Sequence, residues 1–339
     1  MQFGISITIC TYNGKQRIQK AIASIANQKL YNPEYVELII VDNASIDGTV
    51  EYCEMILKAI NLKMRYRILL EPKAGAVNAR YKALQAAQYN WLLICDDDNE
   101  LDENYISNAI SILSTNAKIG ALGGKGIAVF EIAKPNWFDK YCSSYAVEKQ
   151  NDTNGKIKKY NAALYGAGTF FNVSALKKIY ASGFNTVMIG PNKKALTRGE
   201  DTEWCYLLLL QNLEMWYSGN LLFKHYLNKE RITWAYYLEL KKGIANGAAL
   251  LFSYHYILQN NNISSVFYFV KYLKQTLLHT LLYIKYFGYK VISNANEKQL
   301  AFVIAQSKMK SFYYNFFASY QSFKRIKKMV EINTSNVTI

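Results

Sequence analysis

Three adjacent aspartates, Asp96, Asp97 and Asp98, follow an apolar run, and their placement predicts a binding site for a hard cation. The segment reads WLLICDDDNELDENY over residues 91–105. Carboxylates about 4 Å apart repel each other by about 1 kcal/mol in water, and by more near a protein surface. In an extended backbone Asp96 and Asp98 would point to one side and Asp97 to the other. Two converging carboxylates suit Mg²⁺ or Mn²⁺, and such an ion would offset the repulsion.

Two simpler explanations of the same acids stay open. The aspartates could form a solvated acidic loop, or they could cap a helix that begins near Leu101. Asp102 is the better candidate for that cap, so the cap does not require any of the three preceding aspartates.

Asp42 ends a second apolar run, VELIIVD, over residues 36–42. In a dinucleotide-binding fold, an acid in this place would hold the ribose hydroxyls. That fold also needs a GxGxxG motif after the first strand, and this chain has TYNGKQR there, so NAD is disfavoured. The alternative is a turn residue, because Asp42 opens DNASIDGT, a sequence typical of a turn followed by a helix cap.

Alternating strand and helix patterns must position these acids. Continuous apolar runs that alternate with helices are typical of a parallel sheet with both faces covered, and ligands bind such sheets at the carboxyl ends of the strands. Thr11–Asn13, Asp42 and Asp96–Asp98 all fall at predicted strand ends, so we expect them to share one rim. The strands are predicted at residues 3–11, 36–42, 64–70 and 91–96, and the helices at residues 17–28, 49–60 and 76–88.

The chain after residue 119 is less regular, but three segments stand out. YGAGTFFNVSALKKIY (165–180) predicts a strand, a Ser or Asn cap and a helix. EMWYSGNLLFKHYL (214–227) predicts strands. RGEDTEW (198–204) opens an apolar helix with acids, which suit a helix N-terminus. From about residue 235 the chain is predicted to be helical and aromatic.

The chain has 339 residues and is 51% hydrophobic, which suits one large domain or one and a half. Its net charge is +15, and residues 251–339 carry eleven basic and two acidic residues. A basic tail of this kind indicates binding to nucleic acid, to an anionic membrane or to an acidic ligand.

The five cysteines form no CxxC pair and are odd in number. This disfavours a zinc site or a disulfide framework and fits a reducing cytoplasm.

The tail contains one long helical segment, residues 264–287. On a helix, Lys271, Lys274 and Lys285 fall within an arc of about 60°. A helix in the membrane interface is one interpretation, supported by the basic SFKRIKKM at 322–329, and a core or oligomer helix is the other. We expect no signal peptide and no spanning helix, because no run of 18 uninterrupted apolar residues occurs.

Five motifs occur in order over roughly residues 3–230: SITICTYNG, VDNASIDGT, GAVNAR, ICDDDN and RGEDTEW. In this order they resemble the successive motifs of family 2 glycosyltransferases. The resemblance implies an α/β fold of the GT-A type, a Rossmann-like α/β/α sandwich with a mostly parallel central sheet. The catalytic domain would be 1–235, with a nucleotide-sugar half at about 1–118 and an acceptor half at about 119–235. A helical, basic and aromatic C-terminal extension, 236–339, would follow.

The resemblance also implies roles in donor binding. Thr11, Tyr12 and Asn13 would line the nucleotide base, with Tyr12 available for stacking. Asp42 would accept a hydrogen bond from the base, most naturally from the uracil N–H. Arg80 would contact the base or the diphosphate.

The remaining implied roles concern the metal. Asp96 and Asp97 would reach the ribose and the metal, and Asp98 would ligate Mg²⁺ or Mn²⁺ in the DxD manner. His225 would be a further metal or phosphate ligand, although a lone histidine on a strand is more often structural.

The resemblance makes Asp201 the catalytic base, with Glu200 beside it. Displacing a nucleoside diphosphate from an anomeric carbon builds negative charge on the leaving phosphate, which a divalent ion stabilises. The acceptor hydroxyl loses a proton as it attacks, and a carboxylate can take that proton. In-line attack puts this base opposite the leaving group, so it should come from a different segment than Asp98. An acidic helix cap is the alternative for Asp201.

The implied function is an inverting, metal-dependent, non-processive glycosyltransferase of the hexosyl-transferring kind. It would move one sugar from a nucleotide-sugar donor, most naturally a UDP-sugar, to a glycan or lipid-linked glycan acceptor in the synthesis of a cell-surface polysaccharide such as a capsule or O-antigen. We find no QxxRW-type motif, so processive synthesis is disfavoured. The expected location is cytoplasmic, peripheral to the inner face of the cell membrane.

Two rival functions remain. A sugar-nucleotide nucleotidyltransferase would share the layout and the metal, but it should carry a Gly-rich, Arg-containing phosphate loop where TYNGKQR stands. A non-catalytic nucleic-acid or membrane binder would explain the positive charge. We expect no nucleic-acid partner, because acids at three strand ends would repel its phosphates.

Overall fold

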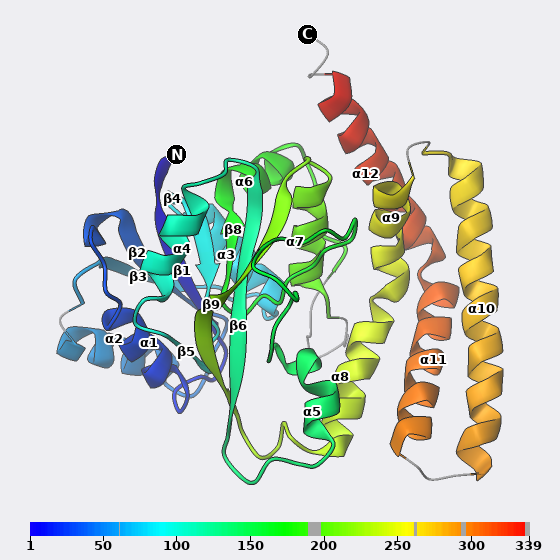
Figure 1. Ribbon diagram of the computed structural model, residues 1–339, viewed down its shortest axis with the longest axis horizontal. Coiled ribbons are helices and arrows are strands. Elements are labelled where there is room, and N and C mark those ends of the chain that lie inside the picture. The colour runs from blue at the N-terminus through cyan, green and yellow to red at the C-terminus, as the bar shows by residue number, and fades with distance from the viewer. Residues whose placement is uncertain (61, 189–197, 261–262, 293–295, 336–339) are drawn as a thin grey trace. The chain divides into compact units, whose positions relative to one another are not determined.

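The computed structural model describes residues 1–60, 62–188, 198–260, 263–292 and 296–335 (Figure 1). The chain divides into two compact units, which are described separately. The first comprises Met1–Gly183 and Leu207–Ile232, and the second Phe184–Tyr206 and Thr233–Ile339. The predicted domain boundary at residue 235 remains a proposal.

Four parallel strands form one half of the sheet in the first unit, as the sequence predicts. β1, β2 and β4 are apolar runs whose residues are mostly buried, as expected of a sheet covered on both faces, whereas the residues of β3 are exposed or half-buried. Their order across the sheet is β3-β2-β1-β4, and the bounds are β1 (Gln2–Thr11), β2 (Val36–Asp42), β3 (Arg65–Leu70) and β4 (Tyr89–Ile94). The register pairs Thr11 with Asp42, so the ends of β1 and β2 lie side by side.

The other half of the sheet mixes both directions. β8 (Thr169–Asn172) runs antiparallel to β4, and β6 (Ile119–Phe130) runs antiparallel to β8. β9 (Glu214–Leu227) then pairs parallel with β6, and Figure 1 shows these two as the longest ribbons of the sheet. The short strands β5 (Asn99–Leu101) and β7 (Gly155–Lys156) pair antiparallel with β9.

Helices cover both faces of this sheet, which confirms the predicted α/β/α sandwich. The alternate residues Ile5, Ile7 and Ile9 of β1 join one buried core with α1 (Ile18–Ala26), α2 (Thr49–Ile60) and α4 (Tyr105–Leu113). Against the opposite face, α3 (Ala76–Ala86) packs on β1 and β2, and α6 (Val173–Ala181) packs on β4. The predicted cap of α6 is Asn172, whose side chain accepts a hydrogen bond from the Ala175 N–H at 2.9 Å.

The shorter helices of this unit are α5 (Phe138–Tyr141) and the 3₁₀ turns η1 (Pro33–Tyr35) and η2 (Cys142–Tyr145).

The helix expected near Leu101 begins later, at Tyr105, and this prediction was therefore wrong by one turn. Residues 99–101 pair with β9 instead, and that pairing keeps their backbone extended. Asp102 ends the extended segment, because its carbonyl oxygen accepts from the Tyr105 N–H at 3.0 Å and its Oδ1 accepts from the Asn104 N–H at 3.0 Å.

The second unit is helical. α10 packs along α11, α11 also packs on α8, and α12 packs on α9; Figure 1 shows α10 and α11 side by side. Their shared core is rich in aromatic rings, with Tyr268 stacked on Phe323 at 4.2 Å between centroids. No helix among the described residues is long and apolar enough to cross a membrane. The helices are α8 (Trp234–Asn246), α9 (Ala248–Gln259), α10 (Ser265–Ile292), α11 (Asn296–Tyr314) and α12 (Phe316–Ser335), and α7 (Glu200–Leu209) starts in this unit.

A fully buried carboxylate ties α7 to its surroundings in the second unit. Glu203 accepts hydrogen bonds from the Tyr254 hydroxyl at 2.6 Å, from the Val187 N–H at 3.0 Å and from the Thr186 hydroxyl. Burial raises the pKa of Glu203, and the hydrogen bonds from Thr186 and Tyr254 oppose that shift. Glu203, the next acid after Asp201 in RGEDTEW, is thus a structural residue.

We predict that Glu203→Ala lowers the free energy of unfolding by about 3 kcal/mol, because it leaves several buried donors without an acceptor. Tyr254→Phe removes one donor and should cost about 1 kcal/mol. Urea unfolding followed by circular dichroism would measure both. An alanine variant as stable as the wild type would contradict the assignment.

Candidate active site

The predicted site residues from β1, β2 and β4 meet at the carboxyl ends of these parallel strands. Thr11 is the last residue of β1 and lies opposite Asp42, the last residue of β2. The Cys95 N–H donates to the Thr8 carbonyl at 2.9 Å, so the chain after β4 also starts beside β1. This is the rim at which open α/β sheets bind ligands.

Asp42 is almost completely buried, with 4% of its surface exposed. Its Oδ2 accepts a hydrogen bond from the Ser45 N–H at 3.1 Å. Its Oδ1 is buried without a hydrogen-bond partner among the described residues. A buried acceptor without a donor costs roughly 1–3 kcal/mol, so the site is suited to a ligand that brings an N–H or O–H to this oxygen.

The turn after β1 holds Tyr12 outward. Asn13 has a φ of 47°, in the left-handed region that asparagine tolerates better than most residues. Its N–H donates to the Ser45 hydroxyl at 2.8 Å and its Oδ1 accepts from the Ile46 N–H at 2.9 Å, so this turn is fastened to the loop after Asp42. Tyr12 remains 47% exposed, which leaves its ring accessible to a base.

Asp97 is held by the first turn. Its Oδ2 accepts from the Thr11 hydroxyl at 2.7 Å and from Arg17 Nη2 at 2.8 Å, and its Oδ1 accepts from Arg17 Nε at 3.2 Å. Burial raises the pKa of Asp97, and the Arg17 guanidinium opposes that shift. A β-carbon on Gly14 would lie 1.9 Å from the Thr11 hydroxyl oxygen and 2.6 Å from Asp97 Oδ2, so this contact requires glycine at position 14.

Asp96 meets a different arginine. Arg80, on α3, places Nη2 3.6 Å from Asp96 Oδ1, and most of the Arg80 side chain is buried. A β-carbon on Gly166 would lie 2.9 Å from Arg80 Nη2. Gly166, the first glycine of GAGTFF, therefore leaves the space that the Arg80 guanidinium occupies.

The backbone through these aspartates turns, so the predicted alternation of their side chains does not apply. The Asn99 N–H donates to the Asp96 carbonyl at 3.0 Å, and the Asp96 N–H donates to Asn99 Oδ1 at 3.2 Å. Side chains in a turn do not alternate as they do along a strand. Consequently Asp96, Asp97 and Asp98 each reach a partner from a different part of the first unit.

Asp98 contacts two groups that follow or belong to β9. His225 places Nε2 3.4 Å from Asp98 Oδ2, and Arg231 donates from Nη1 to the same oxygen. The other oxygen, Oδ1, accepts from Asn99 Nδ2 at 3.2 Å. Burial would raise the pKa of Asp98, but His225 and Arg231 outweigh it and the pKa is lowered, so Asp98 is ionised.

His225 turns one ring nitrogen toward Asp98. The antiparallel register of β5 and β9 pairs it with Asn99, next to Asp98. Its Nδ1 lies 2.7 Å from the Tyr145 carbonyl oxygen, which can only accept, so Nδ1 carries a proton. Nε2 faces Asp98, where it can donate to the carboxylate when protonated or offer its lone pair to a metal ion when not. A carboxylate oxygen of Asp98 and the imidazole nitrogen of His225 are ligand types that could hold Mg²⁺ or Mn²⁺. No group of three or more potential ligands is present in the described parts of the chain.

The predicted base and its neighbour belong to the second unit. Asp201 is in the first turn of α7 and is partly exposed. Its Oδ1 accepts from the Thr202 N–H at 2.8 Å, and Glu200 Oε2 accepts from the Gly199 N–H at 3.1 Å. Both contacts are local, and acids at this end of a helix are stabilised by the helix dipole. The role of Asp201 remains a proposal.

Sequence analysis did not single out two of the arginines at the site. Arg17 stands in TYNGKQR, a stretch that we considered only for a missing glycine-rich loop. A positive charge six residues after the end of β1 was the available signal. Arg231 carried no signal, because its pairing with Asp98 spans 133 residues of sequence.

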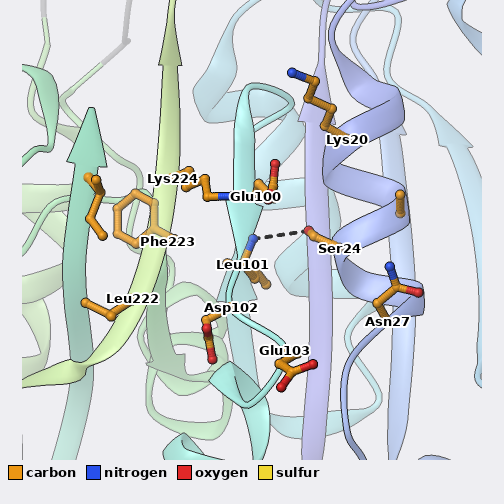
Figure 2. A pocket seen from close by; sticks show the side chains of 12 residues that line it. Lys20, Ser24, Asn27, Glu100, Leu101, Asp102, Glu103, Leu222, Phe223 and Lys224 are labelled. Atoms are coloured by element: carbon orange, nitrogen blue, oxygen red, sulfur yellow. Dashed lines mark hydrogen bonds and ion pairs between the residues drawn. The ribbon is translucent and has the colours of Figure 1, made fainter. Parts of the chain in front are cut away.

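A separate hollow of about 510 Å³ lies between α1 and the β5–β9 pair (Figure 2). None of the predicted site residues lines it. Figure 2 shows Lys224 beside Glu100 and the Leu101 N–H donating to the Ser24 hydroxyl. Because these contacts satisfy polar groups of the lining, the hollow gives no reason to place the active site there.

Sequence comparison supports the resemblance. The poly-beta-1,6-N-acetyl-D-glucosamine synthase of Staphylococcus epidermidis is 29% identical over 121 residues, which are 36% of this chain and 28% of the synthase. The glycosyltransferase GlyG of Streptococcus pneumoniae is 30% identical over 103 residues, which are 30% of this chain and 32% of GlyG. The aligned part spans less than a third of either relative.

Solved structures show the same fold. Residues 1–349 of Staphylococcus aureus TarS, in complex with UDP, align with a TM-score of 0.52 and 15% identity, covering 96% of this chain and 90% of that one. The mannosyltransferase PcManGT from Pyrobaculum calidifontis, in complex with GDP-Man and Mn²⁺, aligns with a TM-score of 0.57 and 15% identity, covering 96% and 86%. The model of glycosyl transferase family 2 matches residues 6–179, and the chain belongs to this family.

Proposed function

We propose that this protein is an inverting, metal-dependent glycosyltransferase that moves one sugar from a nucleotide-sugar to a hydroxyl acceptor. The observation that carries the proposal is the buried Asp42 Oδ1, which has no donor among the described residues at the ligand-binding rim. The ring N–H of uracil is a donor of the right kind for this oxygen. The exposed ring of Tyr12 beside it can stack on the base. We therefore take a UDP-sugar as the donor.

Asp98 and His225 would hold a Mg²⁺ or Mn²⁺ ion that bridges to the diphosphate. When bound, the ion supplies positive charge to the leaving phosphate. The arginines at the site support an anionic ligand, since Arg17, Arg80 and Arg231 bring three guanidinium groups to the same three carboxylates. The related fold of PcManGT holds GDP-Man together with Mn²⁺, which is consistent with this arrangement.

Asp201 is the proposed general base. Its carboxylate would take the proton of the acceptor hydroxyl as that oxygen attacks the anomeric carbon, and one such displacement inverts the configuration. Two points support this role for Asp201: the sequence resemblance, and the position of Asp201 on a different segment from Asp98. Glu203, two residues on, has its carboxylate committed to buried hydrogen bonds and is not a competitor for this role.

The acceptor is proposed to be a glycan or lipid-linked glycan of a cell-surface polysaccharide, reached at the inner face of the membrane. One relative, the poly-beta-1,6-N-acetyl-D-glucosamine synthase of Staphylococcus epidermidis, is named for a polysaccharide, and α10 has a surface suited to a bilayer. Its outward apolar side chains include Val266, Leu277, Leu281 and Ile284, which are 56–71% exposed. α10 contains no Asp or Glu, and Lys271, Lys274 and Lys285 fall on one flank of the apolar stripe. Packing against a second copy would bring these lysines together without counter-charges, so an anionic bilayer fits better.

UDP together with Mn²⁺ should raise the melting temperature by several degrees, because ligands that bind only the folded state stabilise it. Asp42→Ala should weaken UDP binding at least tenfold, by loss of a buried charged hydrogen bond. Asp42→Asn keeps one acceptor oxygen and should lose less. Differential scanning fluorimetry and isothermal titration calorimetry would measure these effects, and a panel of UDP-sugars would then identify the donor. An unchanged melting temperature with UDP and Mn²⁺, alongside a rise with an oligonucleotide, would contradict the enzyme proposal.

Asp201→Asn should lower turnover of the donor by 10²-fold or more while UDP still binds with wild-type affinity, because the base acts in the chemical step. Glu200→Gln, a neighbouring change of the same type, should have a much smaller effect. Single-turnover rates and calorimetric affinities for UDP separate chemistry from binding. Wild-type turnover in Asp201→Asn would rule out this base.

The membrane placement predicts flotation of the protein with vesicles that contain phosphatidylglycerol and not with vesicles of phosphatidylcholine alone. Replacing Leu277, Leu281 and Ile284 by Gln should abolish flotation, since it removes the apolar stripe. A control variant, in which three lysines of the first unit are replaced instead, should float like the wild type. These lysines are Lys63, Lys118 and Lys158. Equal flotation of the α10 variant would reject α10 as the contact, and no flotation of the wild type would reject membrane binding altogether.

A further inference from the structure

Arg231 occupies a place at Asp98 that the proposed metal ion also requires. Its Nη1 donates to Asp98 Oδ2, the oxygen that also lies 3.4 Å from His225 Nε2. Asp98, one of the two groups that fit the ion, is therefore already bound by the positive charge of Arg231. Both side chains are largely buried, with 26% of Arg231 and 13% of Asp98 exposed, so water screens this pair weakly.

The charges of the three adjacent aspartates are matched without any ion. Asp96 faces Arg80, Asp97 is bound by Arg17 in a two-point contact, and Asp98 is bound by Arg231. Three carboxylates thus meet three guanidinium groups. A divalent cation that entered alone would bring two extra positive charges into a neutral cluster, whereas a cation that entered with a diphosphate would bring compensating negative charge.

The backbone around Arg231 is fixed while its side chain extends to Asp98. The Arg231 N–H donates to the Asn228 carbonyl and to Asn228 Oδ1, each at 3.1 Å. The Arg231 carbonyl accepts from the Tyr145 hydroxyl at 3.0 Å. Since the main chain is held on both sides, a change of side-chain rotamer is the simplest way for the guanidinium to leave Asp98.

We propose that Arg231 is an internal counter-cation that competes with the divalent metal for Asp98 and gives way when metal and nucleoside diphosphate bind together. Its guanidinium, once displaced, is within reach of the same site and is suited to a phosphate group. Metal binding and nucleotide binding are thereby coupled, and by linkage each strengthens the other by the same factor. This inference rests on the metal-dependent function proposed above and adds a residue that controls when the metal binds.

The test measures Mn²⁺ binding directly, by electron paramagnetic resonance of unbound Mn²⁺, without nucleotide and without turnover. Arg231→Gln should bind Mn²⁺ on the order of tenfold more tightly than the wild type, because the competing charge is gone. Arg231→Lys keeps a charge and should stay near the wild type. Arg17→Gln removes an equal charge from the neighbouring Asp97 and should change Mn²⁺ binding much less. Saturating UDP should tighten Mn²⁺ binding strongly in the wild type and only weakly in Arg231→Gln.

Several outcomes would overturn the proposal. If Arg231 merely orients Asp98 for the metal, Arg231→Gln will bind Mn²⁺ more weakly than the wild type. Equal gains in Arg17→Gln and Arg231→Gln would show a general effect of charge. Should Arg231→Gln fail to fold, nitrogen NMR of arginine side chains in the wild type replaces it. The Arg231 signal, assigned with Arg231→Lys, should then shift on adding Mg²⁺ with UDP, and an unmoved signal rejects displacement.

The measurement also separates this inference from the proposed function. A wild type that turns over UDP-sugar with Mn²⁺ while Arg231→Gln gains no Mn²⁺ affinity leaves the enzyme intact and removes only the competition. A wild type that neither binds UDP nor turns over any nucleotide-sugar removes the function itself.

Discussion

Three adjacent carboxylates at the end of β4 cannot be held close together away from bulk water unless cations meet them, and the arrangement of the first unit satisfies that constraint. The cations do not come from one segment. Arg17 follows β1, Arg80 lies on α3 and Arg231 follows β9, so each aspartate is matched by a different part of the chain. The turn through Asp96–Asn99 makes this possible, because it separates three side chains that a strand would have left to two sides.

The last strands of the sheet complete the site. β9 is long enough to pair with β6 along most of its length and still reach β5, and the β5–β9 register pairs His225 with Asn99, next to Asp98. The carbonyl of Tyr145 then sets which ring nitrogen of His225 faces the carboxylate. A strand distant in sequence thus supplies a histidine, and the residues just after it supply an arginine. The proposed metal chemistry depends on where β9 ends.

Local patterns in the sequence predicted the first half of the molecule well. Apolar runs of six to ten residues separated by helical periods predict β1 to β4 closely, and the strand ends predict that Thr11 and Asp42 share one rim. Their direct pairing comes from the strand order and register of the structure. The direction of β8, the turn through the aspartates and the pairing of Arg231 with Asp98 were not predictable in this way. Each depends on contacts between segments far apart in the chain, and periodicity carries no information about such contacts. The acids of RGEDTEW illustrate the same limit, because only tertiary contacts distinguish the buried Glu203 from Asp201.

The Asp42 oxygen that has no donor among the described residues has a consequence for the choice of activated sugar under the proposed function. An ionised carboxylate accepts hydrogen bonds and cannot donate them. Uracil and guanine both present a ring N–H, whereas the corresponding ring nitrogen of cytosine is itself an acceptor and would be repelled. Under the proposed function, this oxygen would select the base of the donor independently of the sugar. Sugars activated by uridine or guanosine diphosphate would then be preferred over cytidine-activated sugars, whatever the shape of the sugar pocket.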